Sequence, residues 1–255
     1  MIVIDQYSLG ALPIEMYFND TLLSQGTGFV WIDGDSFFLI TNWHNVSGRN
    51  PNTGKHLSPT AAEPNRLRIW FNTKGEMGNK TAKFIPLRAD TGEPTWFVHP
   101  EHARNVDVVA LALTAFADVE MYPINEMESS NLQLSVGMDV YVLGYPYGLG
   151  GAGLPVWKRG SFATEPGISP AIQLHMFIDT ASRPGMSGSP VIRRSWSTHL
   201  LEQNAIEMGA PIATRFVGVY SGRMSSSDPL DAQLGIAWPA SLVPEIVSGR
   251  KHDDT

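Results

Sequence analysis

The sequence contains no cysteine, which excludes disulfide bonds and thiolate metal sites. It is also short of basic residues, with 18 Lys and Arg against 25 Asp and Glu and a formal net charge of -7. Proteins that bind nucleic acids usually gather basic residues on one surface. Here adjacent basic residues occur only as short pairs, for example Lys158-Arg159 and Arg193-Arg194. We therefore expect no nucleic-acid partner.

Long hydrophobic runs are missing as well. No apolar segment approaches the roughly 20 residues that a membrane-spanning helix requires. The N-terminal stretch MIVIDQYSLGALPIEMYF lacks a basic flank and contains Asp5 and Glu15, so it does not fit a signal peptide. Together with the absence of cysteine, these features predict a cytoplasmic protein that does not associate with membranes.

The chain does contain many short apolar segments separated by turn residues. Residues 27–32 and 36–41 flank the turn Asp33-Gly34-Asp35, a pattern typical of a β-hairpin. Further strand-like segments lie at residues 66–71, 107–113, 139–145, 156–164 and 215–221. Only residues 239–249 show the apolar spacing of a helix. We therefore predict an all-β fold with a C-terminal helix.

The length of 255 residues, 43% of them hydrophobic, is sufficient for one large domain or two halves. The polar residues 125–133 form the expected linker. This places an N-terminal half at residues 1–128 and a C-terminal half at residues 129–255. Residues 197–214 are longer than an ordinary connection, and we expect them to form a surface excursion.

The candidate chemistry begins with RPGMSGSPV, residues 183–191, which holds Ser187 and Ser189. Such a stretch is more often a plain turn, and a serine hydroxyl becomes nucleophilic only beside an imidazole base that a carboxylate orients. His44 follows an apolar strand at the point where the chain turns. Asp107 stands directly before a buried strand, where a carboxylate needs a strong partner such as an imidazolium.

TNWHNV (41–46), NVDVVALAL (105–113) and GMSGSPV (185–191), in this order, resemble the His, Asp and Ser segments of trypsin-like, chymotrypsin-fold serine peptidases. Flanking segments, including GTGFVWIDGDSFFLITNWH (26–44) and VGMDVYVLGYPYG (136–148), are similar to the HtrA/Deg-type branch. The resemblance implies two six-stranded antiparallel β-barrels with the site in the crevice between them. The first barrel would carry the histidine and the aspartate, and the second the serine and the substrate pocket.

The resemblance also implies a role for each residue of the site. Ser187 would be the nucleophile, His44 its general base and Asp107 the group that orients the imidazole. The backbone N–H groups of Gly185 and Ser187 would form the oxyanion hole, and Ser189 would be a small residue at the start of a strand. The implied activity is that of a serine endopeptidase acting on polypeptides without a metal or other cofactor.

The substrate pocket is implied by the same alignment of motifs. Ala181 would lie at the base of the primary specificity pocket, which favours a small or medium apolar side chain before the scissile bond. Tyr220, Ser221 and Gly222 would form the wall strand that pairs with the substrate backbone. Trp43 is bulkier than the residue that commonly precedes the family's histidine, and we expect it to crowd or shape the cleft.

Two features keep other functions open. The chain between the histidine and the aspartate is long for the HtrA/Deg-type branch, so residues 48–64 are expected to form an extra loop, and no PDZ domain is expected after the terminal helix. A catalytically latent or inactive fold could act as a peptide-binding module, because a fold does not imply a function. A protease that needs an activating protein partner, through residues 197–214 for example, is a further alternative.

Overall fold

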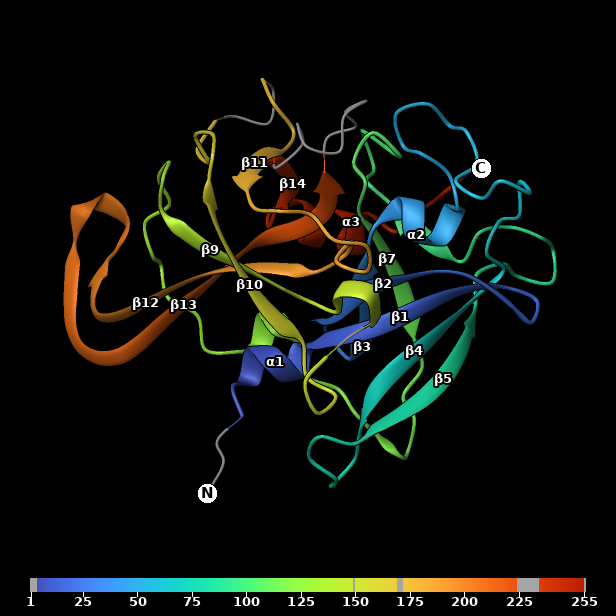
Figure 1. Cartoon of the computed structure of the whole chain (residues 1–255), viewed down its shortest axis with the longest axis horizontal. Helices are drawn as coiled ribbons and strands as arrows, with labels where there is room; N and C mark the ends of the chain where they lie inside the picture. The colour runs from blue at the N-terminus through green and yellow to red at the C-terminus, as the bar shows by residue number, and fades with distance from the viewer. Residues whose placement is uncertain (1–3, 149, 169–171, 224–233, 255) are drawn as a thin grey trace.

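The structure is a computed structural model, and it describes residues 4–148, 150–168, 172–223 and 234–254. Its regular structure is mostly antiparallel strands, with a few short helices (Figure 1). The helices are α1 (Gln6–Gly10), α2 (Trp43–Ser47) and α3 (Leu242–Gly249). The predicted all-β class with a C-terminal helix is confirmed. Among the described residues, none of the helices has the length and apolar character needed to cross a membrane.

The first half forms one sheet in the order β15-β6-β7-β3-β2-β1-β4-β5, with β8 paired to β4. Its strands are β1 (Ala11–Phe18), β2 (Thr21–Asp33), β3 (Ser36–Thr41), β4 (Arg66–Thr73), β5 (Lys80–Pro86), β6 (Trp96–Val98), β7 (Val109–Leu113), β8 (Val119–Glu120) and β15 (Lys251–His252). The predicted hairpin is β2 and β3, in which Asp33 pairs with Ser36 across a tight turn. Three short strands, β6, β8 and β15, extend this sheet beyond the six strands that we expected.

The second half is a closed barrel of six strands, as predicted, in the order β10-β11-β14-β13-β12-β9. Its strands are β9 (Asp139–Gly144), β10 (Val156–Phe162), β11 (Met176–Asp179), β12 (Pro190–Leu200), β13 (Ile206–Arg223) and β14 (Leu234–Pro239). Residues 197–214 form the outer part of the long β12–β13 hairpin, which projects from the body in Figure 1. The surface excursion is therefore a continuation of two barrel strands.

One apolar core joins the two halves. Phe29 and Ile40 of the first sheet pack in the same cluster as Leu143 and Val219 of the barrel, together with Ile246 of α3. The two halves are thus held against each other by a shared packed interior, which resists deformation.

The last described residues return to the first sheet. β15 pairs with β6, and Asp253 beyond it is buried. Its Oδ2 atom accepts hydrogen bonds from Trp43 Nε1 at 2.6 Å and from Trp96 Nε1 at 3.0 Å. Trp43 is fully buried, so our expectation that it shapes the cleft is wrong. Its indole instead anchors α2 to the C-terminal segment.

Candidate active site

His44 lies in the short helix α2, which begins after Asn42 and ends at Gly48. The sequence predicted a turn at this point, whereas the structure has a helix of five residues. The backbone N–H of His44 donates to Asp107 Oδ1 at 2.9 Å, and its Nδ1 lies 2.6 Å from Asp107 Oδ2. Because a carboxylate only accepts hydrogen bonds, Nδ1 carries the proton and Nε2 keeps a free lone pair. The imidazole therefore has the tautomer that a general base requires.

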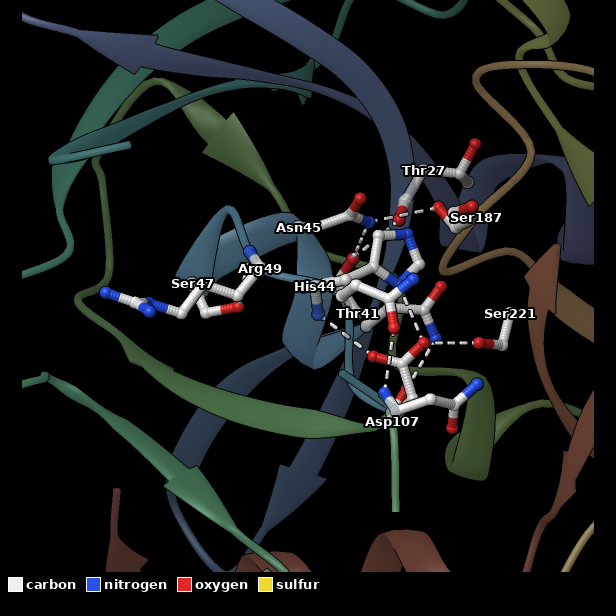
Figure 2. Close-up of polar contacts among 12 residues, drawn as sticks. Thr27, Thr41, His44, Asn45, Ser47, Arg49, Asp107, Ser187 and Ser221 are labelled. Atoms are coloured by element: carbon white, nitrogen blue, oxygen red, sulfur yellow. Dashed lines mark hydrogen bonds and ion pairs between the residues drawn. The ribbon is translucent and has the colours of Figure 1, made fainter. Parts of the chain in front are cut away.

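Asp107 is buried just before β7, and its carboxylate is fully satisfied by donors. Besides the contacts to His44, Oδ2 accepts a hydrogen bond from the hydroxyl of Ser221 (Figure 2). The backbone carbonyl of Asp107 accepts from Asn42 Nδ2 at 2.6 Å. The charge-assisted bonds from His44 and Ser221 to the carboxylate oxygens offset the cost of burying this group. The Ser221 hydroxyl thus positions Asp107, and the pairing of its backbone with a substrate stays a prediction.

Ser187 and Ser189 have different surroundings. Ser187 is half-buried and lines the same cavity as His44. In Figure 2 the imidazole of His44 lies between Ser187 and Asp107. Ser189 is fully buried, so a substrate cannot reach its hydroxyl. The geometry therefore favours Ser187 as the nucleophile of the two.

The backbone before Ser187 has a conformation that requires glycine. Gly185 has a φ of +95°, and a Cβ there would lie 2.3 Å from the carbonyl oxygen of Tyr145, so only glycine fits. The carbonyl of Pro184 accepts a hydrogen bond from Tyr147 N at 2.7 Å. Since C=O and N–H point in opposite directions across a trans peptide, the N–H of Gly185 faces away from Tyr147. Among the described residues, no acceptor binds the N–H of Gly185 or of Ser187.

A buried polar network connects the serine loop to the first sheet. Thr27 donates its N–H to the Ser187 carbonyl at 2.8 Å and its hydroxyl to the Gly185 carbonyl at 2.7 Å. Thr41 donates to the Thr27 carbonyl at 2.8 Å, and Asn45 Nδ2 donates to Thr41 Oγ1 at 3.0 Å and to the Ser187 carbonyl at 3.3 Å. Sequence reasoning missed these residues. One signal was available in the sequence: Thr27, Thr41 and Asn45 are polar, whereas the segments around them, before and after His44, are mostly apolar.

Two cavities meet at His44. The serine cavity, of about 280 Å³, is lined by Ser187, Gly185 and Gln25 among others. The Ser221 cavity, of about 730 Å³, has a mixed polar and apolar lining, in which Leu57, Phe177 and Trp238 are apolar. His175 also lines the Ser221 cavity, and burial lowers the pKa of its imidazole. No group of three or more His, Asp or Glu side chains within the described residues could hold a metal ion.

The predicted wall residues have distinct surroundings. Tyr220 is buried, its N–H donates to the Ser189 carbonyl and its carbonyl accepts from Gly188 N, each at 2.8 Å. It therefore supports the serine loop, and it does not offer its backbone to a substrate as we expected. Gly222 lies beside Ser187, since a Cβ on it would be 3.5 Å from Ser187 Oγ. Ala181 is half-buried, and its place at the base of the specificity pocket stays a prediction.

Comparison with known families agrees with this architecture. The trypsin-like peptidase domain family matches residues 26–198, which is more than half of the chain. The chain belongs to this family. No curated protein matches this trypsin-like peptidase.

Solved structures share its fold at low sequence identity. A serine endoprotease from Yersinia pestis superimposes with a TM-score of 0.51 at 13% identity, over 97% of this chain and 67% of the endoprotease. The HtrA-type protease AlgW, determined with a tripeptide, gives 0.50 at 14% identity, over 94% of this chain and 60% of AlgW. A thermostable serine protease from an extremophilic microorganism gives 0.53 at 11% identity, over 96% of this chain and 99% of that protease. This chain thus spans less than two thirds of AlgW.

Proposed function

We propose that this trypsin-like peptidase is a serine endopeptidase that cleaves polypeptides through Ser187, His44 and Asp107. The observation that carries the proposal is the hydrogen-bonded chain from Ser221 through Asp107 to His44, beside the cavity that Ser187 lines. Nucleophile, base and orienting carboxylate are the parts that acyl transfer by a serine requires.

The chemistry follows from the positions of the protons. Ser187 Oγ attacks the scissile carbonyl while His44 Nε2 takes the proton of the serine hydroxyl. The negatively charged oxygen of the tetrahedral intermediate then accepts hydrogen bonds from the N–H groups of Gly185 and Ser187. His44 then gives the proton to the leaving amine, which departs and leaves an acyl-enzyme. Water repeats the two steps with Ser187 as the leaving group and frees the carboxylic acid. Asp107 remains ionised and stabilises the imidazolium.

The acyl part of the substrate fits the side of the cleft where the Ser221 cavity lies. Gly222 and the backbone beside it are placed to add an extended peptide to β13, a common mode of peptide recognition. Leu57, Phe177 and Trp238 offer apolar surface to side chains farther from the scissile bond. At the bond itself, Ala181 favours a small or medium apolar residue.

The test is the intact mass of the protein after exposure to a fluorophosphonate probe. We expect one adduct on the wild type and on Ser189→Ala, and none on Ser187→Ala. From the behaviour of other triads, Ser187→Ala should lower kcat by about 10⁶ and Asp107→Asn by about 10⁴. A folded wild type without an adduct would instead support the latent or peptide-binding alternative, and an adduct on Ser187→Ala but not on Ser189→Ala would reassign the nucleophile.

A further inference from the structure

Lys80 is a half-buried cation that lines a third cavity in the first sheet. This lysine cavity, of about 280 Å³, is also lined by Glu15, Gln25, Trp70 and Tyr145. The Lys80 ammonium donates to the neutral Asn72 Oδ1 at 2.9 Å, and no carboxylate of the described residues lies within ion-pair distance of it. A charge that is removed from water in this way usually has an ionic partner. Here the protein itself does not supply one.

The other charged and titratable groups around the cavity are already engaged. Glu15 is ion-paired with Arg68 and also accepts a hydrogen bond from Tyr17. The hydroxyl of Tyr145 donates to backbone carbonyls, and burial raises its pKa above the usual range. Burial also lowers the pKa of Lys80 to about 8. The ammonium therefore keeps its charge at neutral pH, and it is the free cation among the described groups that line this cavity.

Gln25 connects the lysine cavity to the serine cavity, because its side chain lines both. The amide packs against Gly148, where a Cβ would lie 2.8 Å from Gln25 Oε1. Within the described residues the Gln25 amide has no hydrogen-bond partner in the protein, so its N–H groups can donate to a ligand. The serine cavity, which Ser187 lines, and the lysine cavity are thus neighbours that share Gln25.

We propose that the lysine cavity binds a carboxylate carried by the leaving-group side of the polypeptide substrate. This rests on the proposed function, in which the acyl part lies along β13 and the leaving part departs on the opposite side of Ser187. Lys80 and the Gln25 amide provide a charged and a neutral donor, which suit a carboxylate. The carboxylate is either an Asp or Glu side chain or the C-terminus of the peptide.

The experiment uses internally quenched peptides in matched pairs on the full chain. One series carries Glu or Gln at successive positions after the scissile bond, and another ends there in a free carboxylate or a carboxamide. At the favoured position the peptide with the carboxylate should have a kcat/KM about tenfold higher, below pH 8, than its neutral Gln or carboxamide counterpart. The neutral peptide cannot form the charged hydrogen bond to Lys80. The advantage should fade as the pH rises above 8 and Lys80 loses its proton.

Variants on the same strand separate a specific effect from a general one. Lys80→Met should abolish the carboxylate advantage, and Lys80→Arg should retain part of it if the cavity still folds. Lys83→Met is the matched control, because Lys83 pairs with Asp118 outside the cavity, and it should keep the full advantage. Equal Glu-to-Gln and carboxylate-to-amide ratios in the wild type and Lys80→Met would overturn the proposal.

Binding of the same peptides to Ser187→Ala keeps this test apart from the test of the proposed function. If the wild type cleaves no peptide and takes up no fluorophosphonate, the proposed function fails. The carboxylate preference is then measured as the ratio of Kd values for the Glu and Gln peptides. A Kd ratio near one on a folded Ser187→Ala chain would reject the lysine subsite by itself.

Discussion

Replacing Asp253 with alanine should weaken the structure that holds His44. Asp253 Oδ2 accepts the indole N–H groups of Trp43 and Trp96, and all three side chains are buried. Alanine would leave both N–H groups without an acceptor, and an orphaned buried donor costs about 1–3 kcal/mol, so we expect unfolding free energy to fall by about 2–6 kcal/mol. Because Trp43 precedes His44 in α2, the fluorophosphonate reaction should also slow.

Urea unfolding of matched variants measures this effect. In Asp253→Asn the amide oxygen can still accept both indoles without the charge, so the loss should be about half as large. Asp254→Ala is the control, because Asp254 is exposed, and a surface change of this kind should stay within about 0.5 kcal/mol of the wild type. A double-mutant cycle with Trp43→Phe should give a coupling of about 1 kcal/mol or more. Equal stabilities of Asp253→Ala and Asp254→Ala would refute the reasoning.

Three further perturbations have defined outcomes. Ser221→Ala removes one donor to Asp107, so steady-state kinetics should show kcat lowered by about tenfold with little change in KM. Thr27→Val removes the hydroxyl bond to the Gly185 carbonyl, which should cost about 1–3 kcal/mol in thermal unfolding and slow adduct formation. Burial lowers the pKa of Lys80 from 10.5 to about 8, so the unfolded chain holds this proton more tightly than the folded one. The charged lysine therefore lowers the stability of the fold, fully below pH 8 and not at all above pH 10.5. Lys80→Met should therefore stabilise the fold by roughly 1–3 kcal/mol at pH 7, and the gap should close as the pH approaches 10.5.

Features with a local signal were predictable from the sequence. The β2–β3 hairpin has its turn residues between two apolar runs, and α3 has a clear apolar spacing that ends near Gly249. His44 and Asp107 stand out because each polar residue adjoins an apolar strand. The resemblance to known motifs added their order along the chain, which separates steps in the sequence cannot supply.

Features that depend on tertiary contacts were not predictable. The helix α2 has only five residues, too few to show a period, and its position depends on Asp107 and Asp253. Ser221 was placed in the wall of the cleft, but whether its hydroxyl faces a substrate or Asp107 depends on the path of β13. The lysine cavity joins residues of several strands, and nothing in the local sequence around Lys80 indicates that it lines a cavity together with Gln25.

The return of the C-terminal segment to the first sheet has a consequence for synthesis on the ribosome. Trp43 and Asp253 are 210 residues apart, so the bond from α2 to the C-terminal segment cannot form until residue 253 has emerged, although the bond to Asp107 can form earlier. Contacts of such long range also close late in folding, because the intervening loop must first lose its entropy. On the proposed function, a nascent chain would therefore carry His44, Asp107 and Ser187 before this anchor of α2 is in place.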